Sequence, residues 1–145
     1  MRQRYFEDIE VGEALEQMIV TPTKRLAIKF AGASGDFYEI HYDKDFAIAA
    51  GQLDVIVHGA QKAAFSAQML TNWMGLQGVL KKVSCSFRGI DFFDVDLICN
   101  GKVIDKFVDE DDHCVECEVW IDNAKGDRTT LGGGVVALPL KGEQS

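Results

Sequence analysis

Apolar residues follow a helical spacing in the first half of the chain and an alternating spacing in the second half. A first helix is predicted to begin after Thr23, a favourable N-cap residue that follows Pro22, and to end at Gly35. Its apolar positions recur every three or four residues and therefore share one face of the helix. They are Leu26, Ala27, Phe30, Ala31 and Ala33.

Two further helices are expected before the chain changes its pattern. Asp43 can cap a short helix that runs through Ala50, and a longer helix begins near His58-Gly59 and ends by Gly75. Because small side chains let backbones approach closely, we expect the long helix to be central, mostly buried and tightly wrapped by a curved sheet. Its stripe of small residues comprises Ala60, Ala63, Ala64 and Ala67.

Alternating apolar and polar residues predict strands over most of the second half. One earlier strand is expected within residues 5–21, after a turn at Gly12. Helices grouped early and strands grouped late indicate an α+β fold with a five-stranded antiparallel sheet. The later strands are predicted at residues 83–88, 95–99, 113–122 and 129–138.

Glycine and turn residues indicate how the last two strands are connected and packed. Residues 123–127, Asn-Ala-Lys-Gly-Asp, are typical of a hairpin turn. Gly132, Gly133 and Gly134 lie inside the final strand, and neither a helix start nor a Lys-Ser/Thr pair follows them. They therefore indicate a bend or a close approach of backbones rather than a phosphate-binding loop.

Length and charge narrow the class of protein. The 145 residues fit one domain, residues 1–145. With 15 basic and 23 acidic residues the net charge is -8, which argues against binding to nucleic acid or an anionic membrane but not against a small anionic ligand. No apolar run reaches the ~18 residues of a membrane span. Residues 1–8 lack the apolar core of a secretory signal, so we expect a cytoplasmic protein.

The four cysteines raise the question of a metal site. Cys114 and Cys117 form a C-x-x-C pair, but Cys85 and Cys99 do not provide a second pair at similar spacing. On a strand, residues three apart point to opposite sides, so Cys117 should face inward and Cys114 outward. We therefore predict reduced structural thiols and no metal site.

One pair of residues is suited to acid–base chemistry. Asp36 and His41 lie in a short loop between two predicted helix caps. A carboxylate and an imidazole on one loop can converge on one water molecule, so that one accepts a proton while the other holds or donates one. The spacing alone does not show that Asp36 has an acid–base role, because an aspartate also suits a turn after a helix. His113 lies beside acidic residues at a strand start and is interpreted as a solvated surface residue.

Residues 30–43, FAGASGDFYEIHYD, carry a resemblance to a known family. They resemble the signature Ser/Thr-Gly-Asp-x-Asn-Pro-aliphatic-His-x-Asp of the MaoC-like, or type 2 (R-specific), enoyl-CoA hydratases. The resemblance continues through Ala50-Gly51 and, six residues later, His58-Gly59. It implies a single hot-dog domain, in which a curved antiparallel sheet wraps a long central helix. It also implies a hydro-lyase of fatty acid metabolism, which adds water reversibly across the C2=C3 bond of a trans-2-enoyl-CoA thioester.

The resemblance implies a role for each site residue. Asp36 and His41 would be the catalytic pair that activates the water and returns a proton to C2. Gly59 would offer its backbone N–H to the thioester oxygen, because such groups at a helix N-terminus are free and carry partial positive charge. Coenzyme A is then part of the substrate, and no cofactor is expected. Basic side chains would bind its phosphates, although each candidate can also be a solvated charge. The candidates are Lys81, Lys82 and Arg88.

The chain departs from the signature at several positions. Tyr38 and Glu39 stand where the family has Asn and Pro. That Asn usually braces the catalytic loop, so the bracing must differ here. Residues 53–55, Leu-Asp-Val, replace the common Gly-Gly-Pro. These departures look similar to the small subunits of two-chain hydratases that act on bulky steroid side-chain thioesters.

Three functions therefore stay open. The first is an acyl-CoA hydratase or dehydratase, and the second is a subunit of a hetero-oligomeric dehydratase that is inactive without its partner. The third is a hot-dog thioesterase, which is disfavoured because residues 60–75 contain no acid. In each case an exposed edge strand would be covered in a homodimer, or in a heterodimer with a related hot-dog chain, through a continuous sheet.

Overall fold

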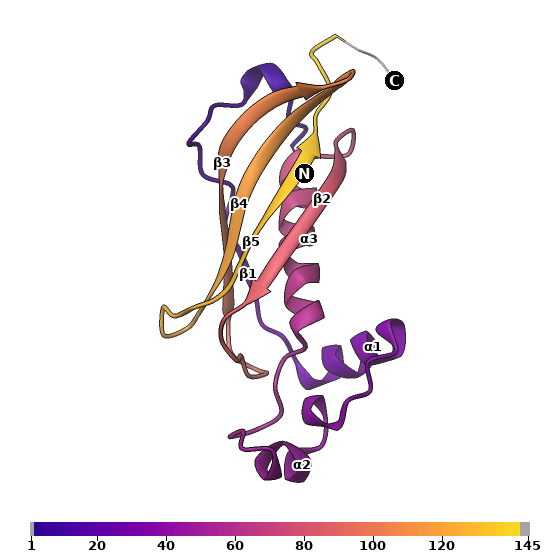
Figure 1. Ribbon diagram of the computed structural model, residues 1–145, viewed down its shortest axis with the longest axis vertical. Helices are drawn as coiled ribbons and strands as arrows, with labels where there is room; N and C mark the ends of the chain where they lie inside the picture. Colours follow the sequence, from indigo (N-terminus) through magenta and orange to yellow (C-terminus); the bar gives the residue numbers. More distant parts are fainter. Residues whose placement is uncertain (1, 143–145) are drawn as a thin grey trace.

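The computed structural model describes residues 2–142, so the two ends of the expected domain 1–145 lie outside the described residues. A long helix packs on one side of a curved sheet, and two shorter helices form a lobe beyond the start of that helix (Figure 1). The helices are η1 Phe6–Asp8, α1 Lys24–Ser34, η2 Glu39–His41, α2 Lys44–Ala49 and α3 Gly59–Met74. The strands are β1 Met18–Val20, β2 Val79–Phe87, β3 Leu97–Asp109, β4 Asp112–Asn123 and β5 Arg128–Ala137.

The predicted helix ends are confirmed by their hydrogen bonds. The Thr23 hydroxyl accepts a bond from Leu26 N, and the Asp43 carboxylate accepts one from Phe46 N. Each bond satisfies an amide that the first turn of a helix leaves free. Gly35 ends α1 with φ at +79°, a conformation that glycine adopts without strain. This glycine turns the chain directly into the loop that carries Asp36.

The five strands form one antiparallel sheet in the order β1-β3-β4-β5-β2. This confirms the α+β prediction, and the turn at residues 123–127 joins β4 to β5 as expected. Large side chains of α3 fill the concave side of the sheet together with inward residues of β3 and β4. The helix contributes Phe65, Met69, Leu70, Trp73 and Met74 to this core.

The small-residue stripe of α3 lies on the opposite side from the one predicted. Ala60 and Ala64 are exposed, and Ala63 and Ala67 are partly exposed. Burial of a large apolar side chain removes more area from water than burial of an alanine, so the bulky residues take the sheet side. The helix is central and half-buried, but its alanines do not carry the contact with the sheet.

The glycines of β5 allow a close approach of strands, as the sequence indicates. A Cβ atom at Gly132 would lie 2.2 Å from the backbone oxygen of Ser84 on β2. A Cβ at Gly134 would lie 2.4 Å from Leu70 Cδ1 on α3. Side chains at either position would therefore push β5 away from its neighbours.

A Gly132→Ala variant is expected to lower the free energy of unfolding by at least ~2 kcal/mol, because the blocking atom belongs to rigid backbone. Urea denaturation measures the loss. Gly32→Ala in α1 is the matched control, since nothing lies within 4 Å of its Cβ position. That control should stabilise the protein by roughly 0.5–1 kcal/mol. A Gly132→Ala protein as stable as wild type would contradict the close approach.

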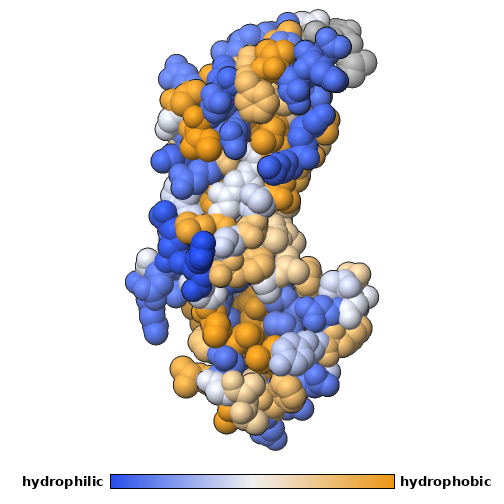
Figure 2. All heavy atoms as spheres, viewed as in Figure 1, coloured by the Kyte–Doolittle hydropathy of each residue, from blue (hydrophilic) through white to orange (hydrophobic). Residues whose placement is uncertain are grey.

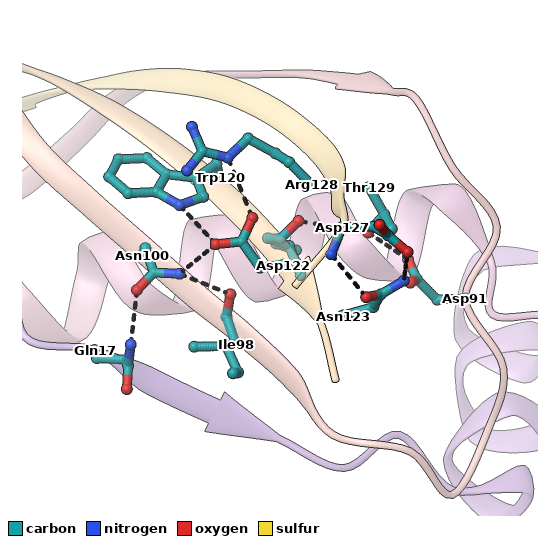
Figure 3. Close-up of polar contacts among 11 residues, drawn as sticks. Gln17, Asp91, Ile98, Asn100, Trp120, Asp122, Asn123, Asp127, Arg128 and Thr129 are labelled. Carbon is teal, nitrogen blue, oxygen red and sulfur yellow. Dashed lines mark hydrogen bonds and ion pairs between the residues drawn. The ribbon is translucent and has the colours of Figure 1, made fainter. Parts of the chain in front are cut away.

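Polar side chains tie the strands together at one end of the sheet (Figure 3). The Asp122 carboxylate accepts hydrogen bonds from the Trp120 indole, the Asn100 amide and the Arg128 guanidinium. The Arg128 guanidinium also lies 4.4 Å from the centre of the Trp120 ring. This network links β3, β4 and β5 across the sheet, next to the hairpin that joins the last two.

The cysteines are free within residues 2–142. Burial raises the pKa of the Cys99 and Cys117 thiols to about 12, so both stay protonated and unreactive. Cys117 is inward as predicted. Cys114 is predicted to point outward, but it is also buried, with only 1% of its surface exposed. None of the helices described between residues 2 and 142 is long and apolar enough to cross a membrane.

Candidate active site

The lobe of α1, η2 and α2 brings Asp36 and His41 to the N-terminal end of α3. Asp36 lies in the loop after Gly35, where its Oδ1 atom accepts a bond from Tyr38 N. His41 ends η2, and its Nδ1 lies 2.8 Å from the carbonyl oxygen of Ile56. These local contacts turn both side chains toward the same point.

The two side chains face one another across a short gap. His41 Nε2 lies 4.0 Å from Asp36 Oδ2. Because the Ile56 carbonyl can only accept a hydrogen bond, the neutral His41 ring carries its proton on Nδ1 and leaves Nε2 as an acceptor. A single water molecule ~2.8 Å from each atom fits this gap and can donate a hydrogen bond to both. The geometry therefore suits activation of one water molecule.

His58 lies under this pair and is not assigned a role by the sequence. Its ring stacks on His41 with centroids 3.7 Å apart and planes at 22°, and Phe30 of α1 covers it at 5.1 Å. His58 Nε2 lies 3.3 Å from the carbonyl oxygen of Asp36. A single buried ring thus contacts both candidate catalytic residues. The His-Gly pair at the helix start is the only sequence signal that points to it.

The environment of His58 disfavours its charged form. Burial, aided by the neighbouring His41, lowers the pKa of His58 below 6.5, although the Asp36 carbonyl and carboxylate oppose the change. The unfolded chain therefore takes up a proton near pH 6.5 that the folded protein takes up only at lower pH.

The free energy of unfolding is consequently expected to fall as the pH drops below 6.5, by at most ~1.4 kcal/mol per pH unit from this group. Urea denaturation between pH 7.5 and 5.5 measures the effect. A His58→Gln variant removes the titrating ring and should show a shallower dependence over the same range. An equal dependence in both proteins would contradict the assigned environment.

Gly59 begins α3 directly beside His58, so its N–H belongs to the first turn, where helix amides have no partner within the helix. A Cβ at this position would lie 3.0 Å from the ring of Phe87 at the end of β2. Glycine therefore lets the chain pass close to the aromatic ring. His41 stacks on His58, the residue directly before Gly59, so the Asp36–His41 gap lies close to the N-terminus of α3.

Asp36, His41 and His58 also have potential ligand atoms within 4.8 Å of one another. The sequence predicts no metal site. A shared ion would need lone pairs that converge, whereas two imidazoles stacked nearly parallel direct their in-plane lone pairs side by side. Moreover, His41 Nδ1 and His58 Nε2 already face carbonyl oxygens. The arrangement therefore suits acid–base chemistry better than a metal ion.

The three basic candidates spread along one strand. Arg88 follows Phe87 at the active-site end of β2 and is exposed. Lys81 and Lys82 lie near the other end of the strand, and Lys81 pairs with Asp112 at 2.5 Å. That contact raises the pKa of Lys81, so the residue stays charged. Of the three candidates, Arg88 is the one next to Phe87, whose ring lies close to Gly59 at the start of α3.

The site is open in the single chain. The Asp36 side chain is 44% exposed and Phe87 is 48% exposed. The outline of the molecule is indented where the lobe of α1 and α2 meets the body of the sheet and α3 (Figure 2). Cavities of about 520 and 210 Å³ lie at the far end of α3, around Asn72 and Trp73, and one of about 320 Å³ lies between residues 90–97 and the turn at residues 123–127. Additional chain would be needed to exclude water from the site.

Comparisons with known proteins agree with the fold. The chain matches the MaoC like domain family over residues 8–118. It is 24% identical over 88 residues to the 3-oxo-4,17-pregnadiene-20-carboxyl-CoA hydratase beta subunit of Mycobacterium tuberculosis, a match covering 61% of this chain and 67% of that protein.

Two solved structures share the architecture. The (R)-hydratase from A. caviae involved in PHA biosynthesis has a TM-score of 0.83 and 25% identity, with 92% of this chain and 99% of that chain covered. The ChsH1-ChsH2 complex from Mycobacterium tuberculosis has a TM-score of 0.79 and 19% identity, with 89% of this chain and 98% of that chain covered. The chain therefore belongs to the MaoC-like domain family and has the hot-dog fold of its hydratases and dehydratases.

Proposed function

We propose that this chain hydrates trans-2-enoyl-CoA thioesters and catalyses the reverse dehydration of 3-hydroxyacyl-CoA. The observation that carries the proposal is the 4.0 Å gap between His41 Nε2 and Asp36 Oδ2 at the start of α3. Two proton acceptors at this separation can hold one water molecule and share its protons. The named (R)-hydratase relative, which covers nearly the whole chain, adds support from homology.

In the proposed hydration, the water oxygen bonds to C3 of the thioester while the C2=C3 π bond breaks. One member of the Asp36–His41 pair takes a proton from the water as the C3–O bond forms, and the pair then delivers that same proton to C2. One molecule of water is consumed, and the pair ends in its starting protonation state. Dehydration is the same sequence in reverse, with no redox change and no further reactant.

Negative charge gathers on the thioester oxygen as the C3–O bond forms. The Gly59 N–H is a fixed donor at the positive end of the α3 dipole, so it would stabilise that charge. Removing one such donor typically costs ~10²–10³-fold in kcat in other enzymes. Arg88 is proposed to bind a coenzyme A phosphate near the site, with Lys81 and Lys82 farther along β2.

A second chain is proposed to complete the site. β2 is an edge strand whose apolar Val79, Val83 and Phe87 are exposed. A related hot-dog chain, or a second copy, would cover this edge through a continuous sheet and would close the open side beside Phe87. The similarity to a hydratase beta subunit favours a partner of different sequence and a bulky acyl group. In that case the chain alone would be inactive.

The test follows the ultraviolet absorbance of conjugated trans-2-enoyl-CoA after adding the purified chain, with a short-chain and a bulky thioester compared side by side. Loss of absorbance without release of free thiol supports hydration. Release of thiol would instead indicate a thioesterase, although α3 carries no acidic residue. A folded but inactive chain would favour the partner-dependent form, and sedimentation would show whether the chain self-associates.

A further inference from the structure

Gln61 lies in the first turn of α3 and has no function in the proposed mechanism. It is only 1% exposed, and neither its Nε2 nor its Oε1 has a hydrogen-bond partner among residues 2–142. A buried amide without partners is costly, by about 1–3 kcal/mol for each group, so such a side chain calls for an explanation. The buried side chain of His58, three residues earlier in the chain, offers that explanation.

His58 Nδ1 is also buried without a partner within the described residues. The other ring nitrogen, Nε2, lies 3.3 Å from the Asp36 carbonyl oxygen, which can only accept a hydrogen bond. The neutral ring therefore carries its proton on Nε2, and Nδ1 is left as an acceptor that needs a donor. Gln61 is three residues further along the chain, and its backbone N–H donates to the His58 carbonyl at 3.1 Å, so both side chains belong to the same turn at the start of α3. The terminal amide can turn either its oxygen or its N–H toward Nδ1. A primary amide supplies the missing N–H.

We propose that Gln61 is a positioning residue, whose side-chain N–H binds His58 Nδ1 and thereby holds His58 against Asp36 and His41. The contacts form a chain. Gln61 fixes the orientation and tautomer of His58, His58 donates to the main chain of Asp36, and the stacked His58 ring supports His41 at 3.7 Å. The proposal rests on the proposed function for its catalytic consequence.

These linked contacts explain how the loop of Asp36 is held although it departs from the family signature. Tyr38 and Glu39 occupy the positions where the resembling family has the Asn and Pro that brace the loop. Tyr38 is half-exposed and packs edge-on against His41 with ring centroids 6.2 Å apart, so an aromatic ring stands at the position where the family has the bracing Asn amide. Gln61 and His58 provide that brace from beneath.

The test compares Gln61→Met, which keeps the length of the side chain but removes its amide, with Thr130→Val as a matched control. Thr130 is another fully buried residue whose side-chain oxygen has no partner among residues 2–142, and it lies on β5. Nitrogen-15 NMR of the histidine rings is the first readout. The His58 Nδ1 resonance should shift downfield in Gln61→Met and stay unchanged in Thr130→Val.

Steady-state hydration kinetics are the second readout. Gln61→Met should lower kcat by about tenfold with KM little changed, because misplacing a catalytic pair slows the chemical step rather than binding. Thr130→Val should leave both constants near wild type. If both the Nδ1 resonance and kcat are unchanged in Gln61→Met, the proposal is wrong.

The NMR readout separates this proposal from the proposed function. If the wild-type chain hydrates no thioester, a shifted Nδ1 resonance still supports the Gln61–His58 contact, and an unshifted one overturns it. If Gln61→Met fails to fold, the Gln61–His58 contact is tested in the wild-type protein. A nuclear Overhauser contact between the Gln61 amide protons and His58 Hε1 is expected there, and its absence would overturn the proposal.

Discussion

Replacing His41 by glutamine is expected to lower kcat for enoyl-CoA hydration at least ~100-fold, and Asp36→Asn should lower it by a similar factor. Glutamine retains a polar group near the Ile56 carbonyl but cannot exchange a proton at neutral pH. Asparagine keeps the shape of Asp36 but is not a base. Each change therefore removes proton transfer while preserving most local contacts.

The double variant adds a sharper expectation. Residues that act on one water molecule act as a unit, so Asp36→Asn/His41→Gln should be little worse than either single change. Kinetics of the three variants with the same thioester measure this. His113→Gln is the matched control, because His113 packs on Phe6 through ring centroids 5.0 Å apart, away from the pair. Near-normal rates in both single variants would place the active site elsewhere.

Features set by neighbouring residues can be predicted from the sequence. Thr23 and Asp43 cap their helices because the amides they bind lie three residues further along the chain. Gly35 ends α1 for a similarly local reason. The spacing of Asp36 and His41 is equally local, since one loop carries both side chains. Local sequence therefore places both side chains in one loop, and the family resemblance singles them out as the candidate pair.

Features that depend on distant partners cannot be predicted in this way. Periodicity shows that α3 has two kinds of face, but only the assembled sheet decides that the bulky face is buried and the alanine face is left open. Strand parity directs Cys114 outward, but it does not reveal that this residue is buried. In both cases burial depends on neighbours far away in the sequence.

The same limit applies to the support of the site. Gln61 and Lys62 are polar residues in an otherwise amphipathic helix, and such residues are usually solvated. The burial of Lys62 depends on residues 89–91, because its ammonium group contacts the Gly89 carbonyl and the Asp91 carboxylate. His58 is visible in the sequence as part of a motif, but its stacking on His41 depends on η2 folding over it. The polar core beneath the catalytic pair is therefore a property of the assembled fold.

Lys62→Met is expected to lower the free energy of unfolding by ~3–5 kcal/mol, because it leaves the Asp91 carboxylate buried without its counter-charge. Lys62 Nζ lies 2.7 Å from Asp91 Oδ2, and the two side chains are 3% and 1% exposed. Lys62 also donates to the Gly89 carbonyl, and Thr129 donates to the same Asp91 oxygen at 2.7 Å (Figure 3). The Asp91 carbonyl in turn accepts from Val57 N, next to His58.

A double-mutant cycle identifies the cause of that loss. In Lys62→Met/Asp91→Asn no charge remains buried, and the amide can still accept the Thr129 hydrogen bond, so most of the lost stability should return. The exposed pair of Lys102 and Glu118, with side chains 49% and 39% exposed, is the control. Lys102→Met should cost less than ~1 kcal/mol, since water already solvates both charges. If Asp91→Asn gave no recovery in the Lys62→Met background, lost packing of the lysine stem would explain the instability instead of the unpaired carboxylate.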